Sequence, residues 1–477
     1  FREIIHNLPK VEEYDDGSFV IQSMNFKEKL FNLYYNLYVH QGGNYMHTKY
    51  HLTAPKHWIN DPIGFIYYQN NYHLFYQHFP YENKWGTMHW GHATSKDLVN
   101  WVDQGIALYP SKDFDANGCF SGSALEVDKK MYLYYTSVVY QKVNPENIHK
   151  TAPGYDFYSS QSMIISDDGF NFDNLNQKQL IIPVFKDGEV GHPVHTRDPK
   201  VWKFQDTYYM VLASKYLDDN NDYNGQLLFY TSKNATEWHY ANNYRGIKCG
   251  DMWECPDIFT VAHQDILIMS PERTNDSGYP SHARITTANF DHQNCQLEIT
   301  GELNYLDYGL DIYAPQTTID EAGRRIYVGW MRMPVADEAN WIGLITYPRV
   351  ITYQNDAIFT NIHPSVDGLF KKPATEFKAT QACKIVTNLK TGDFINIGGY
   401  LIKYDDCLCI DRSNVFKSDT ALKELRSPKI DHCNLNIYYD QDIIEIYINN
   451  GQYVLSNIVY EMADTIKSNT GFEIFTD

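Results

Sequence analysis

The segment His57-Trp58-Ile59-Asn60-Asp61-Pro62-Ile63-Gly64 places a carboxylate between an amide and a proline. A residue that precedes proline is kept out of the helical region, so the Asp-Pro pair predicts an extended backbone that aims the Asp61 carboxylate. The same residue types also form ordinary turns, so this segment alone does not define a site. Two later segments also place an acidic residue in a constrained setting. Thr196-Arg197-Asp198-Pro199 repeats the Asp-Pro pair, and Trp253-Glu254-Cys255-Pro256-Asp257 places a glutamate beside a tryptophan. Three acidic side chains in constrained settings match what cleavage of a glycosidic bond requires.

Short runs of alternating polarity predict an antiparallel, all-β chain from about residue 51 onward. Examples are residues 72–77, 131–136 and 207–212, and clusters of Asn, Asp and Gly separate such runs. The motif segments near residues 61, 120, 198, 254 and 314 recur about every 60 residues. One motif per four-stranded blade predicts a five-bladed β-propeller, in which each inner strand delivers its motif to one axial pocket.

Together these segments make the chain resemble glycoside hydrolase family 32, whose members cleave β-fructofuranosides. The resemblance implies a five-bladed β-propeller followed by a C-terminal β-sandwich. One departure is Ile63, where the family usually carries a second asparagine, and this change bears on the turn that presents Asp61. Further matching segments follow the family's order over roughly residues 51–350: Tyr72-His73-Leu74-Phe75-Tyr76-Gln77, Trp85-Gly86, His89-Trp90-Gly91-His92, Phe120-Ser121-Gly122-Ser123-Ala124, Tyr313-Ala314-Pro315-Gln316 and Gly329-Trp330.

The expected organisation has three parts, because 477 residues exceed the usual size of one core. Residues 1–50 form an N-terminal extension, in which apolar residues at helical spacing predict a short amphipathic helix over residues 26–39. A remnant of a pro-segment is the alternative for this extension. Residues 51–360 form the propeller and residues 375–477 the β-sandwich, where residues 442–456 predict a hairpin with an Asn-Gly turn.

Composition narrows the classes of partner. A net charge of −19 argues against nucleic acid or an anionic membrane surface, whereas a neutral sugar is indifferent to it. The sequence contains no run of 18 apolar residues, so no membrane-spanning helix is expected. We expect a small-molecule sugar substrate, sucrose or a fructo-oligosaccharide, and a monomer or weak homo-oligomer. The chain opens at Phe1 without a charged-then-apolar leader, so a processed, secreted protein is expected.

The resemblance implies a role for each acidic residue. Asp61 would be the nucleophile, Glu254 the acid/base and Asp198 the transition-state stabiliser. We expect Trp253 and a nearby carboxylate to keep Glu254 protonated, and Arg197 to keep Asp198 ionised. Tyr313 and Gln316 suit the lining of the site and the packing of the blade equally well. The substrate-binding residues carried over by position are Asn60, Gln77, Trp85, Phe120, Ser121, Arg197 and Trp330.

Neither a metal nor another cofactor is expected. His89, His92, His192 and His195 lack a clean set of ligands, so structural hydrogen bonding is the favoured interpretation. The eight cysteines include no C-x-x-C pair, which favours free buried thiols over a disulfide framework. Cys407 and Cys409 would face the same side of a strand.

The expected function is a retaining β-fructofuranosidase that hydrolyses sucrose through a covalent fructosyl-enzyme. Alternatives on the same fold are an exo-inulinase or levanase and a fructosyltransferase, which differ in the loops of the acceptor side. A catalytically silent fructan-binding homologue is a further alternative. An inverting, arabinanase-type five-bladed enzyme would leave the segment 253–257 unexplained.

Overall fold

The computed structural model describes residues 48–477 apart from residues 187, 275–280, 337–339 and 419–421, and the backbone of residues 11–13 and 19–21. The chain divides into two compact units, Phe1–Tyr45 and Met46–Asp477. Within the first unit, β1 (Val11–Glu13) and β2 (Phe19–Ile21) pair antiparallel. The helix predicted over residues 26–39 lies outside the described residues.

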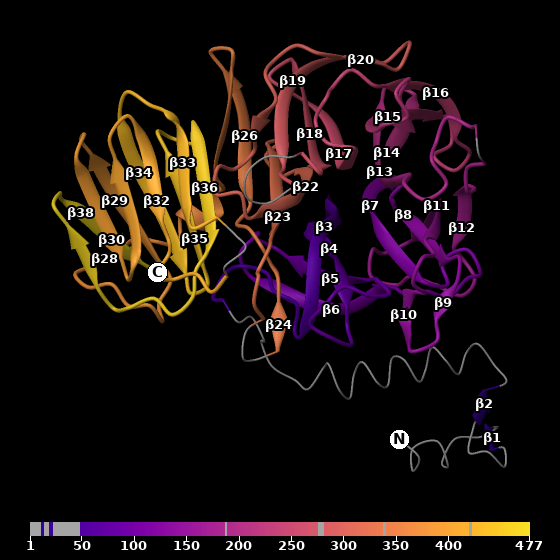
Figure 1. Cartoon of the computed structure of the whole chain (residues 1–477), viewed down its shortest axis with the longest axis horizontal. Helices are drawn as coiled ribbons and strands as arrows, with labels where there is room; N and C mark the ends of the chain where they lie inside the picture. The colour runs from indigo at the N-terminus through magenta and orange to yellow at the C-terminus, as the bar shows by residue number, and fades with distance from the viewer. Residues whose placement is uncertain are drawn as a thin grey trace. The chain divides into compact units, whose positions relative to one another are not determined.

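Five successive sheets over residues 57–362 form the blades of a β-propeller, as predicted (Figure 1). The first two blades contain β3 (His57–Tyr68), β4 (Asn71–Phe79), β5 (His89–Ser95) and β6 (Trp101–Leu108), then β7 (Gly118–Val127), β8 (Lys130–Tyr140), β11 (Phe157–Ser166) and β12 (Gln179–Ile182). The third contains β13 (Arg197–Phe204), β14 (Thr207–Leu217), β15 (Tyr223–Ser232) and β16 (His239–Tyr244).

The fourth blade contains β17 (Met252–Val261), β18 (Gln264–Glu272), β19 (Arg284–Asp291) and β20 (Gln296–Ile299), with β21 (Asn304–Tyr305) paired to β19. The fifth contains β22 (Ile312–Ile319), β23 (Arg325–Met331), β26 (Arg349–Gln354) and β27 (Ala357–Ile362), with β25 (Leu344–Ile345) paired to β23. A separate small hairpin joins β9 (Val143–Asn144) to β10 (Asn147–Thr151).

Apolar side chains fill the space between neighbouring blades. Phe75, Trp90 and Tyr135 share one buried cluster of the first two blades, and Met210 and Leu228 belong to another that joins the second and third. Because each blade packs on both faces, its strands are buried along most of their length. This packing holds the inner strands at fixed positions around the axis.

A parallel strand pair connects the two ends of the propeller. Strand β24 (Trp341–Ile342) pairs with the start of β3, where Trp341 lies opposite His57 and Ile342 opposite Trp58. Thr53 forms a further bridge with Leu344. The last part of the propeller chain therefore hydrogen-bonds to the first blade, which closes the ring.

Each of the five inner strands, β3, β7, β13, β17 and β22, carries a β-bulge at its motif segment. In four of them a proline follows, and proline cannot donate to the ladder, so a bulge is where such a strand tolerates it. The motifs therefore lie inside the inner strands, as predicted, and a β-bulge takes the place of the turn that was expected to present Asp61. The expected extended backbone is wrong for Asp198, which has φ 64°, and Cys255 and Ala314 share this left-handed conformation.

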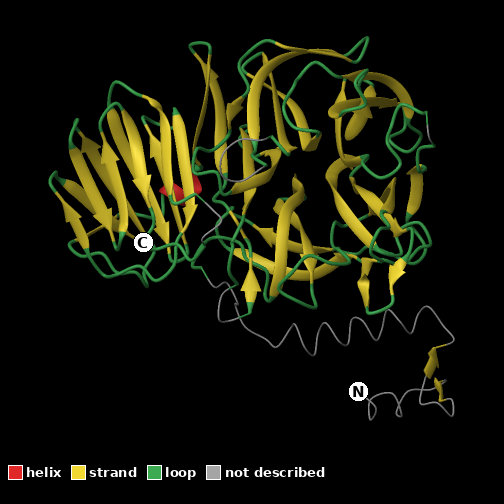
Figure 2. Cartoon of the chain, in the orientation of Figure 1, coloured by secondary structure: helices red, strands yellow, loops and turns green. Residues whose placement is uncertain are grey.

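Residues 372–476 form the predicted β-sandwich of two sheets (Figure 1). Figure 2 shows that strands dominate the described chain, in which α3 (Pro364–Asp367) is a single short helix between the two domains. One sheet contains β28 (Lys372–Ala374), β38 (Phe472–Thr476), β29 (Cys383–Leu389), β34 (Cys433–Asp440), β35 (Ile443–Ile448) and β36 (Tyr453–Ile458). The other contains β33 (Glu424–Lys429), β32 (Cys407–Asp411), β31 (Tyr400–Tyr404), β30 (Asp393–Ile397) and β37 (Ile466–Ser468). The predicted hairpin is the pair β35–β36.

A buried ionic network joins the propeller to the sandwich. The Arg349 guanidinium lies 2.7 Å from an oxygen of Asp307 and 3.0 Å from one of Glu445, and all three side chains are fully buried. Asp307 also accepts the backbone N–H of Ser456 at 2.8 Å. A second fully buried pair joins Arg412 to Asp311. The two domains therefore share charges that neither could bury alone at low cost. Among the described residues, no helix is long and apolar enough to cross a membrane.

Candidate active site

Two of the three carboxylates predicted for the site meet at Cys255. The backbone N–H of Cys255 donates to Asp198 Oδ2 at 2.9 Å, and its thiol lies 3.7 Å from the same oxygen. The thiol also lies 3.6 Å from Asp61 Oδ2. Glu254 precedes Cys255 in the bulge of β17, so all three acidic residues gather where the inner strands approach the propeller axis. The structure therefore brings the predicted trio together.

Asp61 is held by donors on both oxygens. The Ser121 hydroxyl donates to Oδ2 at 2.5 Å, and the Asn60 amide donates to Oδ1 at 3.0 Å. Asn60 is itself oriented by the indole N–H of Trp58, which donates to Asn60 Oδ1 at 2.8 Å. Burial raises the pKa of Asp61 to about 6, the charge of Glu254 adds to this, and the donors oppose it. The carboxylate is thus fixed in direction and close to its titration point near neutrality.

Glu254 is fixed by a guanidinium and a phenol. Arg197 donates to Glu254 Oε1 from Nε at 3.0 Å and from Nη2 at 2.8 Å. The Tyr313 hydroxyl donates to Oε2 at 2.6 Å. The Glu254 side chain is still 20% exposed, so solvent and a ligand can reach it. Tyr313, for which the sequence left two roles open, therefore lies in the site.

The expected pairing of Arg197 with Asp198 is wrong. The two residues are neighbours on β13, but the strand is bulged there and Asp198 has a left-handed backbone. The Arg197 guanidinium donates to Glu254 on the next blade, and Asp198 accepts the N–H of Cys255. Its charge lowers the pKa of Asp198, but burial outweighs it and raises that pKa to about 7. Asp198 is therefore not held ionised by an ion pair, as the sequence had suggested.

Trp253 does not line the site beside Glu254, as had been expected. It is fully buried in a cluster with Phe229 and Leu267, and its indole N–H donates to the Cys249 carbonyl at 2.7 Å. The alternation along β17 turns it away from Glu254. A further carboxylate near Glu254 is Glu272, whose Oε2 lies 3.5 Å from Arg197 Nη2.

Aromatic rings flank the carboxylates. Trp85 is 39% exposed and meets Phe120 edge to face, with ring centroids 5.5 Å apart. Trp330 lies between Trp58 and Tyr313, at centroid distances of 5.8 and 6.5 Å. Phe120 precedes Ser121, so this wall adjoins the hydroxyl that holds Asp61. These surfaces suit the apolar face of a sugar ring.

Two predicted residues serve the scaffold. Gln77 is buried, and its amide donates to the Cys119 carbonyl at 2.9 Å, which ties β4 to β7. Gln316 accepts a hydrogen bond from Lys200 Nζ at 3.0 Å, and Lys200 also pairs with Asp257 at 2.8 Å. The Lys200 contacts link the inner strands of three blades below the carboxylates. Ile63 is fully buried in the core of the first two blades.

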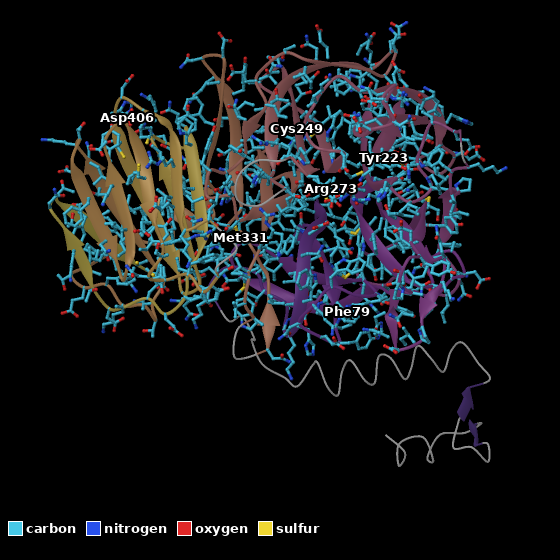
Figure 3. The ribbon with its side chains drawn as sticks, viewed as in Figure 1. Phe79, Tyr223, Cys249, Arg273, Met331 and Asp406 are labelled. Atoms are coloured by element: carbon cyan, nitrogen blue, oxygen red, sulfur yellow. The ribbon has the colours of Figure 1, made fainter. Side chains whose placement is uncertain are left out.

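Charged groups continue outward from Glu254. Arg273, labelled in Figure 3, donates from Nε to Asp251 Oδ2 at 2.8 Å, and Lys215 Nζ lies 3.1 Å from the same oxygen. Arg273 also pairs with Glu272 at 3.4 Å. The Asp251 carboxylate is thus shared by two cations on the side of Glu254. Sequence reasoning missed Glu272, Asp251 and the contacts of Cys255, because no local pattern marks which blades they join.

The histidines take positions within strands and loops. His92 stacks on Phe75 at 4.2 Å, and His89 Nδ1 lies 2.9 Å from the Thr87 carbonyl. His192 Nδ1 accepts the backbone N–H of His195 at 3.1 Å. Within the described part of the chain, no group of three or more His, Cys, Asp or Glu side chains is arranged to hold a metal ion.

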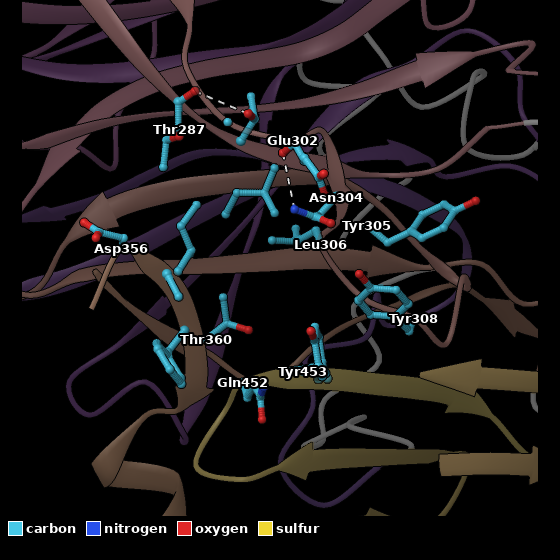
Figure 4. A pocket seen from close by; sticks show the side chains of 17 residues that line it. Thr287, Glu302, Asn304, Tyr305, Leu306, Tyr308, Asp356, Thr360, Gln452 and Tyr453 are labelled. Carbon is cyan, nitrogen blue, oxygen red and sulfur yellow. Dashed lines mark hydrogen bonds between the residues drawn. The ribbon is translucent and has the colours of Figure 1, made fainter. Parts of the chain in front are cut away.

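A cavity of about 350 Å³ is lined by none of these carboxylates (Figure 4). It lies against β19, β21, β27 and β36, where the fourth and fifth blades meet the sandwich. Tyr305, Tyr308 and Tyr453 form one side, with successive ring centroids 5.5 and 5.3 Å apart. Its size does not make it the catalytic centre, because it lacks a paired acid and nucleophile.

Three carboxylates brought together between aromatic rings are the groups that cleavage of a glycosidic bond requires. The model for "Glycosyl hydrolases family 32 N-terminal domain" matches residues 51–361, and that for "Glycosyl hydrolases family 32 C terminal" matches residues 402–477. The chain belongs to glycoside hydrolase family 32 and is a fructosidase of that family.

Several known proteins are similar over nearly the whole chain. A sucrose-6-phosphate hydrolase of Bacillus subtilis is 31% identical over 446 residues, which cover 85% of this chain and 87% of the relative. A raffinose invertase of Escherichia coli is 30% identical over 456 residues, which cover 89% and 91%. Among solved structures, a family 32 β-fructofuranosidase of Bombyx mori gives a TM-score of 0.77 at 24% identity and covers 95% of this chain and 98% of its own. This last likeness shows the fold.

Proposed function

We propose that the chain is a retaining β-fructofuranosidase that hydrolyses sucrose at its β-D-fructofuranosyl unit. The observation that supports this most is that two carboxyl groups of one site are held by different kinds of hydrogen-bond donor. Asp61 is held by Ser121 and Asn60, which are neutral donors, whereas Glu254 is held by the guanidinium of Arg197. One group is poised to attack a carbon atom and the other to exchange a proton.

The proposed reaction has two displacements. Asp61 attacks the anomeric carbon while Glu254 protonates the glycosidic oxygen, and glucose leaves. Glu254, now a carboxylate stabilised by Arg197 and Tyr313, then takes a proton from water that attacks the fructosyl-enzyme. Asp198 lies beside Asp61 at Cys255, where its carboxyl group can bind hydroxyl groups of the fructose ring. It forms no covalent bond to the sugar.

Substrate binding is proposed for the residues around this pair. Asn60, Ser121 and Arg197 present polar groups to the furanose hydroxyls, and the rings of Trp85, Phe120 and Trp330 enclose its apolar surface. Gln77 would act through the position of β7, because its amide is bonded to Cys119.

The acid side of the pH profile is expected to depend on Ser121. Asp61 attacks only as the carboxylate, so kcat/KM on sucrose should fall as the pH drops through about 6. The Ser121 hydroxyl lowers the pKa of Asp61, so Ser121→Ala should move this acid limb to higher pH. Profiles of kcat/KM for both enzymes test this, and a limb that stays in place or moves to lower pH would contradict it.

A second candidate substrate is sucrose phosphorylated on its glucose unit. Two observations favour it: the Bacillus subtilis relative is named a sucrose-6-phosphate hydrolase, and Lys215 and Arg273 lie on the side of Glu254, where the leaving group departs. Both cations already share Asp251, so a phosphate would compete with that carboxylate.

A side-by-side assay decides between these substrates. Rates of hexose release should be measured on sucrose, sucrose 6-phosphate, raffinose, inulin and levan, with the wild type and with Arg273→Met. The proposal expects sucrose to have the highest kcat/KM, with little change in Arg273→Met. A tenfold or larger preference for sucrose 6-phosphate that Arg273→Met abolishes would establish the second candidate. No release from any sugar would indicate a silent binding homologue.

A further inference from the structure

Two cysteine thiols touch on the outer face of the sandwich. Cys407 and Cys409 lie two residues apart on β32, and their sulfur atoms are 3.6 Å from each other. Leu408 and Ile410, which alternate with them, pack in the sandwich core. The thiols therefore point to the opposite face of the sheet. Asp406, labelled in Figure 3, marks the end of the sandwich where this strand begins.

The ladder beside the pair is irregular. Cys407 lies opposite Lys429 and Cys409 opposite Arg426, so β33 carries one residue more than β32 in this stretch. Pro428 lies in that stretch and has no N–H to donate to the ladder. The N–H of Leu408 donates to a side chain, the Ser427 hydroxyl, at 3.0 Å. A bulge bends the strands locally and gives the cysteine backbone freedom that a regular ladder would not.

Cationic side chains surround the pair. Lys403 and Arg426 lie directly opposite Cys409 on its two neighbouring strands, and directly opposite residues share a face. Cys409 is partly exposed, whereas Cys407 is buried. Partial exposure beside cations is the setting in which a thiol reacts readily with a small disulfide. Burial and the neighbouring sulfur of Cys409 raise the pKa of Cys407 to about 11.

We propose that Cys407 and Cys409 form a redox-reversible thiol pair that reacts with small disulfides such as oxidised glutathione. Cys409 is the attacking thiol and Cys407 the resolving thiol, an arrangement typical of redox-active pairs. Of the other six cysteines, five are buried and Cys249 is partly exposed. Reaction should therefore concentrate at this pair.

The chemistry balances in two exchanges. The Cys409 thiolate attacks one sulfur of the small disulfide, whose S–S bond breaks, and one small thiolate leaves with the bonding electrons. Cys407 then loses its proton to solvent and attacks Cys409 Sγ, which releases the second small thiolate. The protein loses two electrons and two protons overall, and the small disulfide becomes two thiols.

The resulting bond should be easy to reduce. A disulfide requires sulfurs about 2.05 Å apart, so the pair must close by about 1.5 Å within one strand. Strained and exposed disulfides have higher reduction potentials, which makes them labile. Dithiothreitol or reduced glutathione should therefore restore the thiols without unfolding.

The test uses the whole native chain with oxidised glutathione, followed by alkylation and peptide mass spectrometry. The wild type should form a disulfide between Cys407 and Cys409, and reduced glutathione should reverse it. Cys407→Ser should stop at a glutathione adduct on Cys409, because the resolving thiol is gone. In Cys409→Ser, the rate of reaction at Cys407 should be at least about tenfold lower than the rate at Cys409 in the wild type.

Controls separate this inference from loss of fold. Cys249→Ser removes the other partly exposed thiol and should leave the reaction at Cys407 and Cys409 unchanged. Circular dichroism and sucrose hydrolysis should be unaltered in Cys407→Ser and Cys409→Ser, since neither residue contacts the carboxylate cluster. A wild type that keeps a stable adduct on Cys409, or single variants that react at equal rates, would overturn the proposal.

Discussion

Asp61→Asn and Glu254→Gln are each expected to lower the turnover of sucrose by a factor of about 10³ or more while the fold survives. Asparagine keeps the shape of Asp61 and its contact with Ser121 but cannot form the fructosyl ester. Glutamine keeps the contacts of Glu254 with Arg197 or Tyr313 but cannot supply the proton, and general acid–base catalysis alone contributes about 10²–10⁴-fold. Initial rates and circular dichroism measure both effects.

Azide separates the two roles. Glu254→Ala should recover part of its activity on an activated fructoside when azide is added, because azide attacks the fructosyl-enzyme without a general base. Asp61→Ala should show no such recovery, since the covalent intermediate never forms. Glu272→Gln is the matched control, because Glu272 also lies near Arg197 and should cost far less. Near-normal hydrolysis by Asp61→Asn or Glu254→Gln would end the assignment.

Arg349→Met is expected to destabilise the folded chain by about 3–5 kcal/mol. The substitution keeps much of the side-chain volume but leaves Asp307 and Glu445 buried without their cation. Burial of an unpaired charge costs far more than an exposed ion pair gains, so the loss should appear in the midpoint of urea unfolding. The junction between propeller and sandwich should weaken first, because the pair spans it.

The matched control is Lys429→Met. Lys429 pairs with Asp406 at 2.8 Å, but their side chains are 85% and 63% exposed. Water screens such an exposed pair, so its removal should barely shift the unfolding midpoint. The double substitution Arg349→Met with Glu445→Gln should recover part of the loss, because one stranded charge disappears. Equal effects of Arg349→Met and Lys429→Met would show that burial of the network contributes little.

Much of the fold was predictable because the repeat carries it. Motif segments about 60 residues apart predict one inner strand per blade. In the structure, each of the five inner strands contains one of these segments. The closure by β24 could not be predicted, since a parallel pair of two residues far from β3 leaves no local pattern. The Arg349 network was hidden for the same reason.

The site was predictable in its residues and not in its contacts. Asp61, Asp198 and Glu254 stand out because prolines and aromatic residues frame them in the sequence. The bulges that aim them depend on how each inner strand pairs with its neighbour, so the left-handed backbone of Asp198 was missed. Arg197 was assigned to its neighbour in sequence, whereas its guanidinium donates to Glu254 on the next blade, at a bulge that the sequence does not mark.

The most direct test of the double displacement is the anomeric form of the first product in water containing methanol. Two inversions restore the starting configuration, so methanol that intercepts the fructosyl-enzyme should give methyl β-fructofuranoside from sucrose. NMR of the early reaction mixture identifies this product, because a methyl fructoside does not mutarotate as fructose does. The account predicts methyl β-fructofuranoside beside fructose, and methyl α-fructofuranoside as the first methyl product would contradict it.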